Sequence, residues 1–269
     1  MNSPKRFLAR QQIQSQFDRA AETYDSVASL QRRMGDMLLR KIVDSDTPKE
    51  SSLIDLGCGT GEFLRQLELD GYSNLAGLDL SSKMIEAARV KAATAKFHHA
   101  SIEELPFEEN VFDLAISNAA IQWCDAATTA TEMLRVLKPD GRILVNVFTS
   151  GTLQQWHDAF VAGGFESRVH RLASAEEIES AFADAGFVAM KPQRQKETTQ
   201  FDSVKKMFDS IRQLGATNAM SSRARSMSRG EYVWIKNHFQ SELDSNGKLE
   251  LDFQWIQLEA QKKARQSVN

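Results

Sequence analysis

Cysteine is scarce in this sequence, and long apolar runs are missing. Its 269 residues include two cysteines, Cys58 and Cys124, which are too few for a disulfide framework and indicate a reducing compartment. No run of about 18 apolar residues could form a membrane span. The N-terminal segment MNSPKRFLARQQIQSQF also lacks the apolar core of a signal peptide. We therefore expect a soluble, cytoplasmic protein with no membrane partner.

The sequence also lacks a large excess of either positive or negative charge. The formal net charge is −3, which gives no argument for a nucleic-acid partner. This average hides a basic segment, because residues 191–230 contain nine basic and three acidic side chains. The segment carries a net charge of +6, and the rest of the chain carries −9. We expect such a segment to attract an acidic partner.

Short apolar runs alternate with helical patterns along most of the chain. Strands are predicted at 52–57, 74–80, 95–101, 112–119, 142–148, 187–193 and 249–261. Helices are predicted at 4–42, from the turn after residue 57 to residue 71, and at 81–93, 126–138, 153–162, 174–185, 201–214 and 230–243. The alternation with short links predicts one α/β domain with a doubly wound, mostly parallel seven-stranded sheet.

A glycine-rich turn, DLGCGTG, follows the first predicted strand. It contains Asp55, Gly57, Gly59 and Gly61, at the strand end where doubly wound sheets bind ligands. A dinucleotide fingerprint would need glycine where Glu62 stands, and a P-loop would need a Gly-Lys-Ser/Thr sequence that is missing. An acid before a turn without diphosphate-binding residues indicates a ligand that carries an ammonium group rather than a phosphate.

Polar residues also end the second and third predicted strands. Asp79 lies 22 residues after Gly57, and its carboxylate can accept hydrogen bonds from both hydroxyls of a ribose. Ser101, Ile102 and Glu103 follow the third strand and could meet the edge or face of an adenine. A ribose, an adenine and an amino-acid end without phosphates describe S-adenosylmethionine.

Four ordered motifs, DLGCGTG, GLDLSSKMIEAAR, SIEELPFEENVFDLAISN and LKPDGRILV, resemble those of class I S-adenosylmethionine-dependent methyltransferases. The resemblance implies a Rossmann-like fold, with S-adenosylmethionine as methyl donor and S-adenosylhomocysteine as product. It implies that Asn118 lies beside the methyl-bearing sulfonium. The full predicted cofactor set is Phe17, Asp55, Gly57, Cys58, Gly59, Gly61, Asp79, Leu80, Met84, Ser101, Ile102, Glu103, Asn118 and Ala119. Within it, Cys58 is interpreted as a small loop residue and not as a nucleophile.

The sequence after the fourth predicted strand limits the methyl acceptor. It reads SNAAIQWC and not the Asn-Pro-Pro-Tyr type found in enzymes that methylate nucleobase amines or glutamine amides. Small molecules or carrier-bound groups remain as acceptors. No metal site is expected, because His98 and His99 are adjacent on a strand and point to opposite faces.

Segments throughout the chain, among them FDRAAETYDSVASLQRRM, FTSGTLQQWH and IRQLGATN, resemble the malonyl-acyl-carrier-protein O-methyltransferases of biotin synthesis. Departures from this family include the tail after Gln261, which has no counterpart. The resemblance implies methylation of the free carboxylate of a malonyl thioester, giving an ester that is elongated toward pimelate. A carboxylate is already ionised at neutral pH, so no general base is expected. Tyr24 and Trp123, together with Phe17, would form an aromatic wall that positions the reactants.

The same resemblance predicts the acceptor side. Arg212, Thr217 and Asn218 would bind the malonyl carboxylate, since a guanidinium suits a carboxylate. The basic side chains Lys205, Lys206, Arg223, Arg225 and Arg229 would dock the acyl carrier protein.

We divide the domain into a helical cap at 1–45, a cofactor core at 46–150, a substrate roof with strand six at 151–248, and a final strand and tail at 249–269. Methylation of a free small carboxylic acid or a quinone-type metabolite, and a non-catalytic cofactor-binding regulator, stay open as alternatives.

Overall fold

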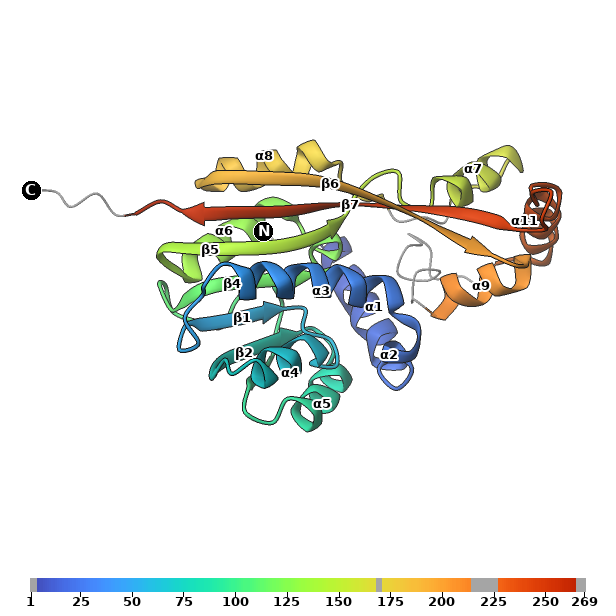
Figure 1. Ribbon diagram of the computed structural model, residues 1–269. Helices are drawn as coiled ribbons and strands as arrows, with labels where there is room; N and C mark the ends of the chain where they lie inside the picture. The colour runs from blue at the N-terminus through green and yellow to red at the C-terminus, as the bar shows by residue number, and fades with distance from the viewer. Residues whose placement is uncertain (1–3, 168–170, 214–226, 265–269) are drawn as a thin grey trace, which may run out of the picture.

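One seven-stranded sheet runs through the protein (Figure 1). The computed structural model describes residues 4–167, 171–213 and 227–264. The strands are β1 (Ser52–Leu56), β2 (Asn74–Asp79), β3 (Lys96–His99), β4 (Phe112–Asn118), β5 (Leu137–Phe148), β6 (Phe187–Phe201) and β7 (Leu249–Lys262). Their order is β3-β2-β1-β4-β5-β7-β6, and β7 is antiparallel to both of its neighbours while the other pairs are parallel. The predicted doubly wound, mostly parallel seven-stranded sheet is confirmed.

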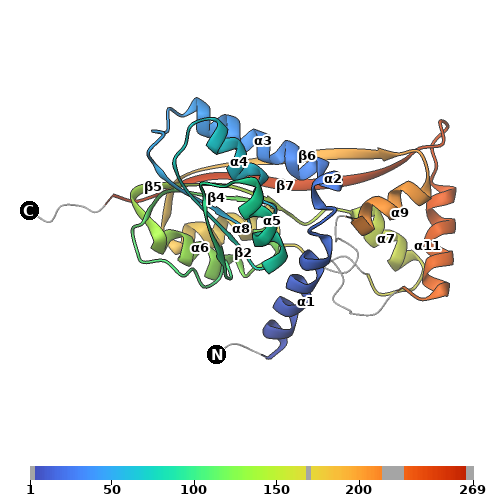
Figure 2. The same cartoon turned by 90° about the horizontal axis from the view of Figure 1, so that it is seen from below.

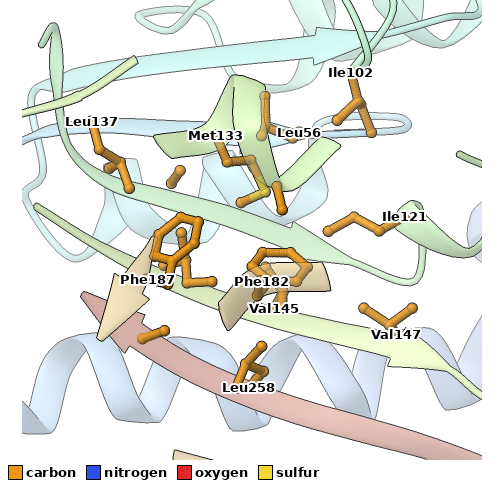
Figure 3. Packing of buried hydrophobic residues seen from close by; sticks show 14 of the residues in the cluster. Leu56, Ile102, Ile121, Met133, Leu137, Val145, Val147, Phe182, Phe187 and Leu258 are labelled. Atoms are coloured by element: carbon orange, nitrogen blue, oxygen red, sulfur yellow. The ribbon is translucent and has the colours of Figure 1, made fainter. Parts of the chain in front are cut away.

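Helices cover both faces of this sheet. One face carries α3 (Ser29–Asp44), α4 (Glu62–Leu69) and α5 (Ser82–Lys91), which bury Leu38, Leu64 and Ile85 against it. The other face carries α6 (Ala126–Val136) and α8 (Ala175–Ala185). Figure 3 shows Met133 of α6 and Phe182 of α8 packed with Val145 and Leu258 of the strands. The central strands β1, β2 and β4 are buried on both faces and therefore read as nearly continuous apolar runs in the sequence.

The N-terminal segment predicted to be helical over 4–42 is helical, but it is divided into three helices. The helices are α1 (Pro4–Ala20), α2 (Tyr24–Val27) and α3. The short helix α2 is held by long-range contacts, because Asp25 accepts a hydrogen bond from Thr60 Oγ1 at 2.6 Å and forms an ion pair with Lys91. A continuous helix could not bring Tyr24 and Asp25 against the glycine turn, so tertiary contacts override the local helical pattern.

Strand β6 is longer than predicted. The prediction ended it at Gln193, but pairing with β7 continues to Phe201, which lies opposite Leu249. Residues 194–200 are polar throughout, so they lack the alternation that marks a half-buried strand. Their hydrogen bonds to β7 hold them in the strand, and β7 carries the apolar pattern.

Three further helices pack on the outer half of the β6–β7 ribbon, at one end of the molecule (Figures 1 and 2). They are α7 (Gln154–Ala162), α9 (Val204–Gln213) and α11 (Arg229–Ser241). We call this unit the helical extension; it corresponds to most of the predicted roof. Its core contains Trp156, which stacks on Phe239 with ring centroids 5.6 Å apart.

Other predicted boundaries differ by a few residues. Helix α6 ends at Val136 and not at Lys138, because Leu137 already pairs with Phe112 in the sheet. Helix α9 begins at Val204 and not at Phe201, which still belongs to β6. No helix in the described parts of the chain is long and apolar enough to cross a membrane.

Candidate functional site

A cavity lies at the carboxyl ends of β1, β2 and β4, and α1 lines one of its walls. Its empty volume is about 670 Å³, including the open space at its mouth. Parallel strands bring their carboxyl ends to one edge, which is why residues from distant parts of the sequence meet here. The predicted cofactor residues that line it are Phe17, Gly57, Gly59, Asp79, Leu80, Met84, Ser101, Ile102, Glu103, Asn118 and Ala119. Tyr24 and Trp123 line it as well.

The glycine turn has two different structural roles. Gly57 has φ +80°, and a Cβ there would lie 2.2 Å from the Cβ of Ala120, so no side chain fits. The backbone N–H groups of Gly57 and Cys58 both donate to the carbonyl oxygen of Leu78, which fixes the turn over β2. Gly61 does not line the cavity. A Cβ at Gly61 would lie 2.9 Å from the backbone of Ala88, so this glycine allows α4 to pack on α5.

Asp79 is held at the end of β2 by two backbone donors. Its oxygens accept hydrogen bonds from Gly59 N at 2.9 Å and from Ser81 N at 2.8 Å. Burial raises the pKa of Asp79, while these two hydrogen bonds lower it. Each oxygen keeps a lone pair for a ligand, and paired hydroxyls such as those of a ribose match this arrangement.

Asp55 lies at the end of β1, behind the cavity wall, with 3% of its surface exposed. Among the described residues, none donates a hydrogen bond to its carboxylate. Burial, followed by the nearby charge of Asp79, raises the pKa of Asp55 to about 7. Burial and the acids Asp79, Asp25 and Asp55 also raise the pKa of Tyr24, so its hydroxyl stays protonated. This region therefore favours a cationic ligand, because a buried carboxylate without a partner is costly.

The wall formed by α1 is fastened to the opposite side of the cavity. Arg10 donates from Nε and Nη2 to one oxygen of Glu103, at 2.9 and 2.6 Å, and the other oxygen accepts from Asp125 N at 2.9 Å. Asp18 accepts from Ser81 Oγ at 2.6 Å. The sequence prediction missed Arg10, since nothing local pairs it with a residue 93 positions away. The spacing of Arg10, Ile13 and Phe17 along one helix face is the signal that could have identified this wall.

The aromatic wall predicted from the sequence has its members at the cavity. Phe17 and Trp123 meet edge to face with ring centroids 6.1 Å apart. Tyr24 lies between this cavity and a second hollow at the start of α3 and α4, which Cys58 also lines. Burial raises the pKa of the Cys58 thiol, which fits the interpretation that it is not a nucleophile.

Asn118 is fixed by a buried chain of amides. Its Nδ2 donates to the carbonyl oxygen of Gln31 at 2.7 Å, and its Oδ1 accepts from Asn146 Nδ2 at 3.0 Å. Asn146 also donates to the carbonyl oxygen of Met34 at 2.8 Å and accepts from Gln257 Nε2 at 3.2 Å. Asn146 and Gln257 are both fully buried, so this network joins α3, β4, β5 and β7 beneath the cavity.

The predicted acceptor-side residues are only partly described. Arg212 lies in the last turn of α9, a helix that contacts α2. Thr217, Asn218, Arg223 and Arg225 lie outside the described residues. Lys205 and Lys206 form ion pairs with Asp209 and Asp202 one turn away on their own surface. Arg229 is the first residue of α11. Docking roles for these basic residues stay predictions.

The adjacent side chains of His98 and His99 make different contacts, as expected for side chains that point to opposite faces of a strand. The His98 ring meets Phe107 edge to face with centroids 4.8 Å apart. Nε2 of His99 lies 2.9 Å from the carbonyl oxygen of Leu80. Ala120 and Cys124 also line the cavity and were not predicted.

Comparisons with known proteins agree with this geometry. A family model described as "Methyltransferase domain" matches residues 54–145. The malonyl-acyl-carrier-protein O-methyltransferase of Erwinia pyrifoliae is 34% identical over 236 residues, which are 85% of this chain and 87% of that protein. The chain belongs to the malonyl-acyl-carrier-protein O-methyltransferase family. The member from Herminiimonas arsenicoxydans is 29% identical over 96% of this chain and 98% of its own length.

The fold also matches solved structures. The YcgJ protein of Bacillus subtilis superimposes with a TM-score of 0.62 at 20% identity, over 84% of this chain and 97% of that one. As a member of a methyltransferase family, the protein uses S-adenosylmethionine as its methyl donor. The residues present fit this group. The buried carboxylate of Asp55, which accepts no hydrogen bond from a described residue, is available for its cationic part, and the two oxygens of Asp79 are available for its ribose hydroxyls.

Proposed function

We propose that this protein transfers a methyl group from S-adenosylmethionine to the free carboxylate of a malonyl group carried by acyl carrier protein, and that the ester primes pimelate and biotin synthesis in the cytoplasm. The observation that carries the proposal is the 34% identity to a protein of that name over 87% of its length. The donor would supply a methyl group bound to a sulfonium sulfur. A carboxylate oxygen of the malonyl group would attack this methyl carbon directly while the bond between the methyl carbon and sulfur breaks.

The chain's own residues would bind and orient the donor. Asp55 would face the ammonium group, Asp79 the ribose hydroxyls, and Ile102 with Leu80 the adenine. The glycine turn allows close approach of the backbone, since Gly57 and Gly59 have no side chain in the way. Asn118, held by its amide network, and the ring of Tyr24 border the position proposed for the methyl group.

No base is needed on the acceptor side, but a cation is. The acids around the cavity would repel a second carboxylate, so an arginine beside the malonyl group would offset the cost of its burial. Support for Arg212 is that α9 contacts α2, which begins at Tyr24. Thr217 and Asn218 would donate further hydrogen bonds, and Lys205, Lys206, Arg223, Arg225 and Arg229 would attract the carrier.

Methyl transfer from labelled S-adenosylmethionine tests the proposal. We expect label in malonyl-loaded acyl carrier protein and in malonyl-pantetheine, a small thioester, but not in free malonate or aconitate. Label in the free acids alone would assign the protein to small-acid methylation and overturn the carrier proposal. Donor binding without transfer to any acid would favour the regulatory alternative.

A further inference from the structure

The exposed face of α11 combines apolar and basic side chains. Arg229, Tyr232, Val233 and Lys236 follow one another at helical spacings and share one face. Tyr232 is 47% exposed and Val233 is 46% exposed. Glu231, which is the only acid of this helix, is 5% exposed because it forms a capping box with Ser228. The face is therefore apolar and cationic, with no accessible carboxylate of its own.

The two cations on this face, Arg229 and Lys236, differ from those of the basic segment at 191–230, to which only Arg229 belongs. The other described cations of that segment whose side chains can be compared are all paired with acids. These pairs are Lys191–Glu259, Arg194–Glu176, Lys196–Asp252, Lys205–Asp209 and Lys206–Asp202. Within the described residues, no acid lies within ion-pair distance of Arg229 or Lys236. Their charges are therefore available to a partner.

Packing connects this face to the cavity. The ring of Tyr232 meets Phe208 of α9 at a centroid distance of 5.4 Å, and Phe208 meets Trp156 of α7 at 5.0 Å. The same apolar cluster contacts Ala119 and Trp123, which line the cavity. The face and the cavity thus belong to one packed unit, and α9 contacts both α11 and α2.

We propose that the α11 face, formed by Arg229, Tyr232, Val233 and Lys236, docks the acyl carrier protein, and this inference rests on the proposed function. The occupant is a carrier with an acidic surface, because unpaired cations around exposed apolar side chains complement such a surface and steer it. The other end of α11 adjoins a hollow lined by one lysine, Lys248, and by four acids, Asp158, Glu242, Asp244 and Glu250. These acids repel an acidic carrier and orient it along the helix.

The double variant Val233→Ser with Lys236→Glu tests the docking surface. We expect kcat/KM for malonyl-loaded carrier to fall about ten-fold, mainly through KM, because one apolar contact is lost and one attraction becomes a repulsion. The value for malonyl-pantetheine should stay within about two-fold, since the small thioester needs no protein docking. Salt should slow the wild-type reaction with the carrier more than the variant reaction.

A matched control is Val43→Ser with Arg40→Glu on α3, where both side chains are exposed, have the same helical spacing as Val233 and Lys236, and lie outside the helical extension. This control should leave both substrates unchanged. An equal loss with carrier and with malonyl-pantetheine, or no loss with either, would overturn the docking site. A larger loss for Lys206→Glu than for Lys236→Glu would place docking on α9 and refute the proposal. A wild-type protein that methylates neither thioester would instead refute the proposed function.

Discussion

The cavity and the helical extension use charged residues in opposite ways. At the cavity, Asp55 is buried with no described hydrogen-bond donor, and burial raises the pKa of both Asp55 and Asp79. On the extension and its ribbon, exposed cations such as Lys205 and Lys206 pair with acids one turn away. A buried charge without a partner is stabilised only when a ligand arrives. An exposed ion pair contributes about 0–1 kcal/mol and identifies no ligand.

This difference distinguishes the part of the protein proposed to bind the donor from the part proposed to bind the carrier. If the proposed function is correct, donor binding depends on a few buried groups at the end of the sheet, so single substitutions there should have large effects. Carrier binding would depend on surface charge and apolar contacts, so each substitution on the extension should have a smaller effect. The proposed docking face of α11 is the place where surface charge would meet a partner.

The largest expected effect is that of Asp79→Ala. The variant should weaken binding of S-adenosylmethionine by about 100-fold, because it removes a charged acceptor for two hydrogen bonds. Titration calorimetry measures this dissociation constant. Asp113→Ala is the matched control, since Asp113 also accepts a backbone hydrogen bond but lies at the opposite end of the sheet. Equal losses in both variants would show that Asp79 acts through stability rather than through the ligand.

The second expected effect is a pH dependence of donor binding. Free Asp55 has a pKa of about 7, and an ammonium group beside it would lower that pKa in the complex. Binding then releases a proton below pH 7, so affinity should rise about ten-fold per pH unit up to pH 7 and fall again above about pH 8, where the α-amino group of the donor loses its proton. Dissociation constants measured from pH 5.5 to 8.5 check this slope.

Asp55→Asn should remove the slope and weaken donor binding at pH 8. It should also raise the free energy of unfolding of the donor-free protein at pH 8. The sign follows from the raised pKa, because the wild-type folded state loses stability as the pH rises from the unfolded pKa of about 4 to the folded value. A donor affinity that is independent of pH in the wild type would contradict the role of Asp55.

The smallest expected effect is that of a substitution at Asn146, a β5 residue in the amide network beneath the cavity. Asn146→Leu leaves Asn118 Oδ1, the Met34 carbonyl and Gln257 Nε2 without their partner. We expect the free energy of unfolding to fall by about 2 kcal/mol, and both donor affinity and methyl transfer to fall about three-fold. Urea denaturation and initial rates measure these changes. A loss of carrier methylation with unchanged donor affinity would assign Asn118 to the acceptor side instead.

Much of the donor site could be predicted from the sequence, because its residues lie directly after strands whose apolar runs are easy to recognise. Gly57, Asp79 and Asn118 all line the cavity as expected. Gly61 was predicted to bind the donor but instead packs α4 against α5, since a glycine pattern alone does not separate close helix packing from ligand contact. Arg10 was missed because its partner Glu103 is distant in the sequence.

The sequence by itself determined the alternation of strands and helices, the glycine turn and acids at one edge of the sheet, and the family resemblance, because apolar runs, glycines and acids at fixed spacings specify local structure and chemistry. Only the tertiary structure decided that α2 breaks from α1, that residues 194–200 extend β6, and that Arg10 of α1 pairs with Glu103. These outcomes depend on contacts between segments far apart in the chain. No local sequence pattern indicates such a contact, since it forms only when folding of the sheet brings the two contacting segments together.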